Sequence, residues 1–368
     1  MDPQVTLLQT TKSILTFTLS HCNVSLANAL RRIILSEIPI IIIRSFPYEK
    51  NDVIVHINTT RLNNEILKQR LSSIPIYIRD QLSEEELQEY EVVINKKNES
   101  GAIEFITTED FKIKHGDKEL TDAVVHKIFP PDPITKDYIL FARLRPKISD
   151  DIPGEELKIT AKLSIGSAKE SSTFNVVSTC SYAMTPDEAQ QYAAWGEKEK
   201  KLEAIGYSEN EMGLLKKNWF LDEGRRIYKE DSFDFIVESL GVFSNKKIVQ
   251  MAALIINKKL SLLATQIAEG SFPIAPSKST VKNSFDLTLV NESYTIGKVI
   301  EFLLYQQHYI TDGTLLYVGF VKNHPHDDNS LIRIVFKEAV EETMVLQYLS
   351  GVLRQAQQIF TSIHDQLT

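Results

Sequence analysis

The chain has 368 residues, 43% hydrophobic and 24% charged, which is ordinary for a globular protein of two or three domains. Its formal net charge of -8, without a dense Lys/Arg stripe, argues against direct binding of nucleic acid. Its two cysteines, Cys22 and Cys180, are too few for a disulfide framework or a four-cysteine metal site. This cysteine usage predicts an intracellular protein.

The sequence also predicts neither a membrane span nor an export signal. The longest aliphatic run, residues 38–43, contains Pro39 and is far shorter than the ~20 residues that a transmembrane helix needs. The first twelve residues, MDPQVTLLQTTK, lack the basic start and apolar core of a signal peptide. We therefore expect no contact with a membrane.

The first predicted elements are a strand and a helix that recur near the other end of the chain. Residues 13–34 realign without a gap on residues 283–304, and each copy runs from an alternating strand through a polar turn into an amphipathic helix. The first helix begins near Ser25 and is predicted to stop before Pro39, because proline disfavours helix at the residue before it. Residues 40–43 are then expected to form a strand.

Residues 47–230 have a different rhythm and interrupt this first unit. Short alternating segments between turn residues predict strands at 53–57, 103–107, 138–144, 157–165 and 173–177. Helix-forming residues between 185 and 228 predict short surface helices. We therefore expect a mixed, mostly β insert domain.

A second repeat follows the insert. Residues 232–261 and 331–360 each predict a strand, a polar break and a long helix, with the helices at about 245–267 and 340–363. Both helices carry one apolar stripe, which favours packing against each other over the alternative that each covers only its own sheet. Residues 269–282, rich in Pro, Ser and Gly, predict a linker.

These patterns together predict an α+β fold made of two strand–helix dimerisation units that pair within one chain. One unit would be formed by residues 1–46 with 231–268, and the other by residues 283–368. The side chains expected at this pseudo-dimer interface are Leu26, Leu30, Ile33, Ile34, Ile296, Ile300, Leu303, Ile255, Leu349 and Leu353.

Catalytic motifs are missing from the sequence. It contains no nucleophile motif, no glycine-rich phosphate loop and no aspartate triad of the kind that holds catalytic magnesium. The one metal-like cluster is residues 323–328, with His324 and His326. Because Pro, Asp and Asn between two apolar runs are typical of a hairpin turn, we favour a turn there over a metal site.

Several motifs resemble the α-type assembly subunits of multisubunit DNA-directed RNA polymerases. Residues 24–39, VSLANALRRIILSEIP, are similar to the family's signature helix. Residues 58–76 are similar to its second motif, in which a turn, a helix ending in Arg-Leu and an Ile-Pro strand follow one another, and residues 138–178 resemble the segment that closes its insert domain. Residues 285–360 resemble the small partner subunit, archaeal L or the eukaryotic eleventh subunit.

The resemblance thus implies a fusion of a third-subunit (archaeal D-like) half with an eleventh-subunit (archaeal L-like) half. Such a fusion resembles the polymerase subunit of large nucleocytoplasmic DNA viruses, which would place the protein in the virus factory of the host cytoplasm and in the virion. The implied function is a noncatalytic scaffold for DNA-templated transcription, on which the two large catalytic subunits assemble.

The resemblance also implies partners and contact residues. The partners would be the largest and second-largest polymerase subunits and small subunits of the tenth-subunit type. The positions matching family contacts with the second-largest subunit are Asn28, Arg31, Arg32, Arg70, Ile74, Pro75 and Ile76. From the residues alone, Arg31 and Arg32 would be interpreted as a solvated helix face.

Two departures from the family pattern bear on these expectations. The insert lacks the cysteine cluster that binds metal in many relatives, so we expect no cofactor on this chain, with magnesium and zinc only on other subunits. Ser72 stands where the family frequently has glycine. The rival hypotheses are a free-standing ligand-binding or hydrolytic protein that uses the insert domain, which would need a pocket of convergent titratable groups, and a self-contained nucleic-acid binder.

Overall fold

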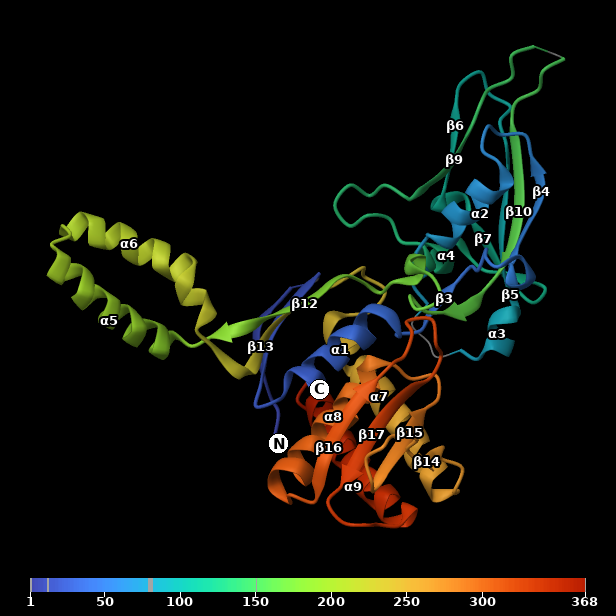
Figure 1. Ribbon diagram of the computed structural model, residues 1–368. Helices are drawn as coiled ribbons and strands as arrows, with labels where there is room; N and C mark the ends of the chain where they lie inside the picture. Colours follow the sequence, from blue (N-terminus) through green and yellow to red (C-terminus); the bar gives the residue numbers. More distant parts are fainter. Residues whose placement is uncertain (1, 12, 79–81, 150, 368) are drawn as a thin grey trace. The chain divides into compact units, whose positions relative to one another are not determined.

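The computed structural model describes residues 2–11, 13–78, 82–149 and 151–367, and the chain forms two compact units (Figure 1). The first unit comprises Met1–Leu35, Val177–Ser239 and Asn245–Thr368, and the second comprises Ser36–Val176 and Leu240–Ser244. The second unit is shorter than the expected insert of residues 47–230. The difference arises because β13 (Tyr228–Ser239) pairs with β2 (Ile14–Ser20) and β12 (Val177–Pro186) pairs with β13, so that residues 177–239 belong to the first unit.

The first unit begins with a four-stranded antiparallel sheet in the order β1-β2-β13-β12. Its strands are β1 (Gln4–Thr10), β2 (Ile14–Ser20), β13 (Tyr228–Ser239) and β12 (Val177–Pro186). Every second side chain of β2 is fully buried, as alternation predicts for a sheet with one covered face. At its centre the ring of Phe17 stacks on that of Phe235, with 4.9 Å between centroids.

A helical hairpin joins β12 to β13. It consists of α5 (Glu188–Ile205) and α6 (Glu209–Leu221), followed by a 3₁₀ turn at Glu223–Arg226, and it confirms the helices expected between residues 185 and 228. The hairpin has a small core of its own, formed by Trp195, Met212 and Trp219. Gly206 ends α5 with φ of 95°, a left-handed conformation that glycine adopts without strain.

Two further helices of this unit follow β2 and β13. Helix α1 (Val24–Ser36) ends before Pro39, as predicted, and α7 (Asn245–Ala268) packs on β2 and β13. By length and composition alone, α7 is long and apolar enough to cross a membrane. Its apolar stripe, however, is buried against protein, and the core helix of a folded domain passes the same test.

The second half of this unit repeats the plan with a sheet in the order β14-β15-β17-β16. The strands are β14 (Ile274–Pro276), β15 (Ser284–Leu289), β17 (Ser330–Phe336) and β16 (Leu315–Val321). Helix α8 (Tyr294–Leu304), which continues as a π-helical segment over Tyr305–Thr311, packs on β16 and β17, and α9 (Glu342–Asp365) packs on α8. The predicted linker is therefore partly strand, because β14 pairs with β15.

The two copies of the strand–turn–helix unit agree in backbone detail. His21 and Asn291 occupy equivalent turn positions of the repeat, and both have φ of 56°, which few residues other than glycine adopt. The turn between β16 and β17 also has the predicted form: Asp327 Oδ2 accepts a hydrogen bond from the His324 amide at 2.9 Å. The structure thus confirms the predicted repeat and the predicted hairpin turn.

The second unit is built on a five-stranded antiparallel sheet in the order β4-β10-β5-β7-β8, with two small two-stranded sheets, β11-β3 and β6-β9. In chain order its strands are β3 (Ile40–Ile42), β4 (Val53–Asn58), β5 (Tyr90–Lys97), β6 (Glu104–Thr107), β7 (Lys112–His115), β8 (Lys118–Glu119), β9 (Leu140–Leu144), β10 (Glu156–Lys162) and β11 (Ser164–Gly166). Its helices are α2 (Asn64–Ser72), α3 (Glu84–Gln88) and α4 (Asp122–Ile128), with 3₁₀ turns at Tyr48–Lys50, Thr108–Asp110 and Ser172–Phe174.

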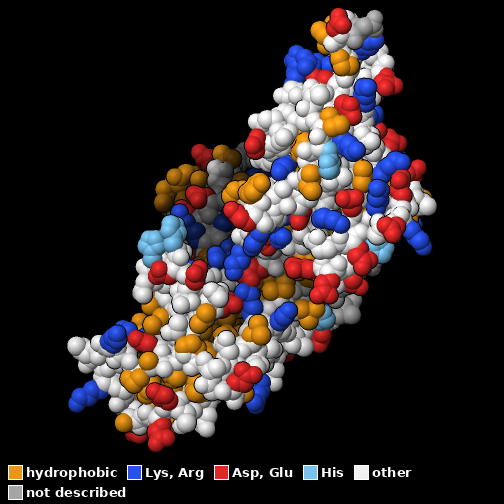
Figure 2. All heavy atoms as spheres, turned by 90° about the vertical axis from the view of Figure 1, so that its right-hand side faces the viewer, with side chains coloured by type: hydrophobic (Ala, Val, Ile, Leu, Met, Phe, Trp, Pro, Cys, Tyr) orange, Lys and Arg blue, Asp and Glu red, His pale blue; other side chains and the backbone are white. Residues whose placement is uncertain are grey.

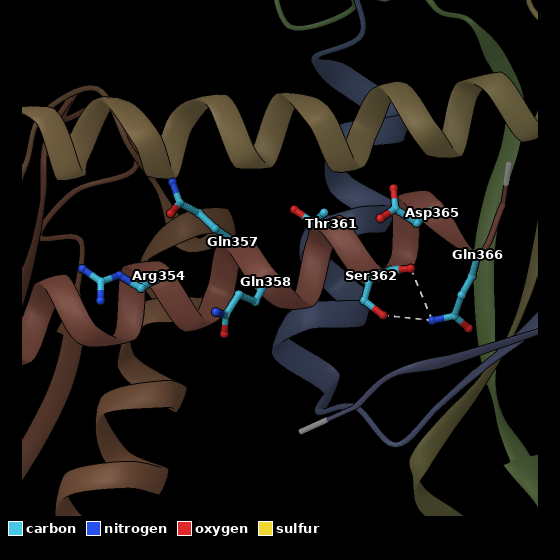
Figure 3. Close-up of a pocket in the computed structure, with 7 residues that line it drawn as sticks. All are labelled: Arg354, Gln357, Gln358, Thr361, Ser362, Asp365 and Gln366. Atoms are coloured by element: carbon cyan, nitrogen blue, oxygen red, sulfur yellow. Dashed lines mark hydrogen bonds between the residues drawn. The ribbon is translucent and has the colours of Figure 1, made fainter.

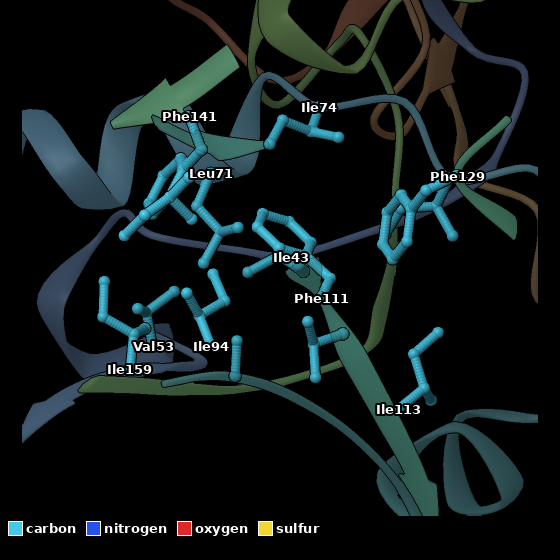
Figure 4. Close-up of a cluster of buried hydrophobic side chains, with 14 of the residues drawn as sticks. Ile43, Val53, Leu71, Ile74, Ile94, Phe111, Ile113, Phe129, Phe141 and Ile159 are labelled. Atoms are coloured by element: carbon cyan, nitrogen blue, oxygen red, sulfur yellow. The ribbon is translucent and has the colours of Figure 1, made fainter. Parts of the chain in front are cut away.

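This sheet and its helices enclose one hydrophobic core (Figure 4). Phe111 lies at its centre and meets Phe129 and Phe141 edge to face, with centroid distances of 5.4 and 5.6 Å. Two predicted strands are absent from this region. Residues 172–174 form a 3₁₀ turn in place of a strand over 173–177, and the Ile-Pro strand that the resemblance implies at the end of residues 58–76 is not formed, because residues 74–78 belong to no sheet.

The two cysteines are buried, and both are free. Burial raises the pKa of the Cys22 and Cys180 thiols to about 12. At pH 8 the thiolate fraction is then lower than in an unfolded cysteine by about three orders of magnitude. We expect Ellman's reagent to label the native chain extremely slowly and the guanidinium-unfolded chain at once.

The raised pKa values of the two thiols also make the stability of the fold depend on pH. Because the unfolded chain loses these thiol protons at lower pH than the folded chain, stability falls as the pH rises from about 9 toward 12. Replacing both cysteines by alanine should flatten this part of the stability curve. Rapid labelling of either thiol in the native chain would contradict the burial.

Candidate subunit interface

The largest helix contact of the first unit joins the two halves of the chain: α7 from the first half packs along α9 from the second. Their apolar stripes are fully buried, with Ala252, Ile256 and Leu260 on α7 and Leu349, Leu353 and Ala356 on α9. Polar bonds flank this contact: Asn257 Nδ2 donates to Thr361 Oγ1 at 3.0 Å and Gln357 Nε2 to Ser261 Oγ at 2.8 Å. The expected pairing of the two long helices is therefore present.

The side chains predicted for the internal interface are almost all buried. Full burial is found for Leu26, Leu30, Ile33, Ile34, Ile296, Ile300, Leu303, Leu349 and Leu353. Ile255 is only half-buried, and its neighbour Ile256 takes the inward position. Both isoleucines belong to the apolar stripe of this helix, and the side chain named for the interface lies at the edge of the buried part of that stripe.

Arg32 of α1 reaches the second half. Its Nε donates a hydrogen bond to Thr295 Oγ1 at 2.8 Å, and Thr295 is buried at the start of α8. A charge-assisted bond of this kind is stronger than a neutral one, and a buried hydroxyl that lost it would be costly. Arg32, expected to contact another subunit, therefore uses one of its donors inside the chain.

Arg31 and Asn28 form a separate polar group on α1. The Nε and Nη2 atoms of Arg31 donate to Asn28 Oδ1 at 3.0 and 2.8 Å, so one turn of helix fixes the guanidinium. The same guanidinium lies close enough to Cys180 on β12 to act on the thiol electrostatically. Both side chains stay partly exposed, as a contact with a second protein requires.

The second predicted contact motif lies in the other compact unit. Arg70 is exposed but donates from Nε to the Phe141 carbonyl at 2.8 Å and from Nη2 to the Leu140 carbonyl at 2.7 Å, which ties α2 to β9. Ile74 and Ile76 are buried in the core of that unit, and Figure 4 shows Ile74 beside the Phe111 cluster. Between them, Pro75 is partly exposed. Among the predicted contact residues of this motif, only Arg70 and Pro75 are therefore exposed enough to contact another protein.

Two more polar contacts join the halves and were not predicted. Lys259 Nζ of α7 lies 2.9 and 3.2 Å from the carboxylate oxygens of Glu292, in the turn before α8. The side-chain amide of Gln366 accepts from the Val5 amide and donates to the Pro3 carbonyl, both at 2.8 Å, so it pairs with the outer edge of β1. No sequence motif marks the residues of these contacts, because each bonds to a residue distant in the sequence. They are Thr295, Lys259, Glu292 and Gln366.

The surface beside these helices is polar and open. A groove of about 640 Å³ follows α9 and is lined by Arg354, Gln357, Gln358, Thr361, Ser362, Asp365 and Gln366. Figure 3 shows these side chains along one helix, with Gln366 bonded back to Ser362. Only Arg354 and Asp365 among them are charged. The groove therefore offers no convergent set of catalytic groups.

The charge distribution gives no sign of a nucleic-acid track on the face shown in Figure 2, where Lys and Arg side chains intermingle with Asp and Glu. Within the described part of the chain, no group of three His, Cys, Asp or Glu side chains is placed to hold a metal ion.

The Arg32–Thr295 bond can be tested by a double-mutant cycle with Arg32→Ala and Thr295→Val. Each single change should lower the free energy of unfolding by about 1–3 kcal/mol, since each leaves a buried polar group unpaired or removes a charged hydrogen bond. The pair should couple by about 1 kcal/mol in urea titrations followed by circular dichroism. Arg354→Ala, on the exposed side of α9, is the control. Additive effects would show that the bond does not hold the halves together.

Comparisons with known proteins agree with this architecture. The RNA polymerase Rpb3/Rpb11 dimerisation domain matches residues 16–260. DNA-directed RNA polymerase subunit Rpo3 of Pyrococcus horikoshii is 26% identical over 274 residues, 70% of this chain and 94% of that protein. Subunit 3B of the DNA-directed RNA polymerases IV and V of Arabidopsis thaliana is 27% identical over 290 residues, 67% of this chain and 86% of that protein.

Subunit RPAC1 of the human DNA-directed RNA polymerases I and III is 31% identical over 196 residues. This match covers 47% of this chain and about half (51%) of the human protein. The domain match extends over more than half of the chain and includes β2, α1, β13 and most of α7. The chain therefore belongs to the RNA polymerase Rpb3/Rpb11 dimerisation domain family.

Proposed function

We propose that this chain is a noncatalytic scaffold subunit of a DNA-directed RNA polymerase, on which the two large catalytic subunits assemble. The packing of α7 against α9 within one chain is the observation that carries this proposal. A dimerisation domain needs a partner with a matching apolar stripe, and here the second half supplies one. The relatives, all subunits of DNA-directed RNA polymerases by name, support the same role.

The two halves form a pseudo-dimer in this proposal. The second half has the strand–turn–helix order of the first, with the same left-handed turn residue, which supports a fusion of third-subunit-like and eleventh-subunit-like partners. Fusion makes the pairing intramolecular, so its effective concentration depends on the connection and no longer on expression level. The second compact unit, Ser36–Val176 with Leu240–Ser244, would be the insert that interrupts the first half.

The proposed partners follow from the exposed polar residues. Asn28 and Arg31 on α1, together with Arg70 and Pro75 of the other unit, would contact the second-largest subunit, while Ile74 and Ile76 would support that surface from the core. Arg32 would serve mainly the internal pairing. The largest subunit and a small subunit of the tenth-subunit type complete the proposed set.

The cellular location of the protein and the absence of a bound metal are proposed from the fusion and from the number of cysteines. Two halves in one polypeptide favour the polymerase of a large nucleocytoplasmic DNA virus, active in the host cytoplasm and carried in the virion. The chain would hold no metal and touch neither nucleic acid nor membrane, with magnesium and zinc on other subunits. The chain has only two cysteines and both are buried, which supports the proposal that it holds no metal.

The scaffold role is tested by purifying the tagged chain from cells that express it naturally, with mass spectrometry and an assay of promoter-independent RNA synthesis. We expect the two largest polymerase subunits to co-purify in stoichiometric amounts with RNA-synthesising activity. Arg31→Ala should weaken the recovery of the second-largest subunit about tenfold, since it removes an oriented guanidinium from an interface. Recovery of the chain alone would overturn the scaffold role, and full recovery by the Arg31→Ala variant would overturn that contact.

The pseudo-dimer is tested by placing a protease site between residues 278 and 282 and cleaving the purified chain. The α7–α9 contact should keep the two fragments together in gel filtration at micromolar concentration. In a variant with Leu349→Asp and Leu353→Asp, cleavage should release them, because two carboxylates would enter an apolar interface. Leu254→Asp, at an exposed position of α7, is the matched control. Fragments that separate without any substitution would contradict the pairing.

A further inference from the structure

The loop between β3 and β4 presents two large aromatic side chains to solvent. Phe46 is 82% exposed and Tyr48 is 84% exposed, whereas Phe17, Phe111 and Phe233 are completely or almost completely buried. Burying such a ring against a partner removes a large apolar surface from water, and aromatic rings are enriched at the energetic centres of protein interfaces. Two exposed rings at the tip of one loop therefore mark a contact surface.

The base of this loop is closed by Asp52. Its amide donates to the Arg44 carbonyl at 2.7 Å, and its Oδ2 accepts from the Arg44 amide at 2.9 Å and from Ser164 Oγ at 2.7 Å. Within the loop the Asn51 amide donates to the Tyr48 carbonyl at 3.2 Å. These bonds restrain the backbone of the loop, which lowers the entropy that a binding partner would have to remove.

The surroundings of the loop are acidic. An open pocket of about 490 Å³ is lined by Glu49 from the loop and by Glu84 and Glu85 from the first turn of α3, among other residues. Arg44 at its wall is already engaged, since its Nη2 lies 2.6 Å from the Ile165 carbonyl and 3.1 Å from Glu170. Lys50 is the remaining cation among the lining residues. The pocket therefore favours a positively charged side chain.

We propose that Phe46 and Tyr48 anchor this chain to another polymerase subunit, whose surface offers an aliphatic recess for the rings and a Lys or Arg for the acidic pocket. This inference rests on the proposed scaffold function. The carboxylates beside the rings decide the class of partner, because they would repel the phosphates of nucleic acid and the anionic headgroups of a membrane. The aromatic pair supplies affinity, and the carboxylates supply orientation and charge selection.

The test compares capture of the two largest subunits by the full tagged chain and by a Phe46→Ala, Tyr48→Ala variant. Because both rings project into solvent, the variant should keep the circular dichroism spectrum and thermal midpoint of the original chain. Its recovery of a large subunit should fall at least tenfold. A Glu84→Lys, Glu85→Lys variant should also lose capture, with the deficit greatest at low salt, where charge repulsion is least screened.

Ile134→Ala with Ile148→Ala is the matched control, since these side chains are 87% and 71% exposed in the same compact unit. This control should capture both large subunits normally. Capture by the original chain and equally by the aromatic variant would overturn the inference while leaving the scaffold function intact. Failure of the original chain to capture either subunit would overturn both this inference and the proposed scaffold function. Loss of capture from the original chain after nuclease treatment would assign the loop to nucleic acid and would also overturn the inference.

Discussion

The first compact unit depends on the burial of α7 against α9. Each helix has 24 residues and is therefore about 36 Å long, and each has a stripe of aliphatic side chains that a single four-stranded sheet cannot cover. Exposing one buried leucine or isoleucine costs about 1.5–3 kcal/mol, so exposing six would cost about 9–18 kcal/mol, as much as the whole stability of about 5–15 kcal/mol of a typical domain. Neither half is therefore expected to be stable without the other, and the polar contacts at the edges act on a pairing that the apolar stripes already determine.

The polar contacts between the halves give this apolar pairing its register. Apolar stripes can shift by one helical turn and stay apolar, whereas a partly buried hydrogen bond such as that from Arg32 to Thr295 forms in one alignment only. The Lys259–Glu292 ion pair, with both side chains partly buried, adds a second fixed point at a different place on the interface. Polar residues thus select one arrangement among several that would bury similar area, as a buried asparagine does in coiled coils.

Much of this fold could be predicted from the sequence because its signals are local. The period of the apolar residues, the stop at Pro39 and the turn residues at 323–328 act within a few positions, and the corresponding elements formed as expected. Membership of a strand in a particular sheet is not local, so β12 was placed in the insert although it joins the N-terminal sheet by pairing with β13, which itself pairs with β2. The expected strand at 173–177 failed for a local reason: Ser171 Oγ accepts from the Thr173 amide and begins a 3₁₀ turn.

The candidate interface was predictable only in part for a related reason. A sequence motif indicates which residues are candidates for a contact, but the direction of each side chain depends on neighbours from other helices and strands. Ile74 and Ile76 face a core built by distant strands, and Arg32 finds Thr295 263 residues away. No pattern within α1 distinguishes Arg32 from Arg31, yet one donates across the halves and the other to its own helix. Side-chain direction was therefore the missing information.

The bond of Gln366 to the edge of β1 has a consequence for chain connectivity. It places residues 3–5 next to residue 366. A short peptide could therefore bridge them, while the loop at 277–283 could be opened without cutting a helix or strand. The ribosome would then make the half with α9 before the half with α7, and the same interface could still form. The order of synthesis is thus not dictated by the architecture, and circularly permuted versions of this subunit should be compatible with its fold.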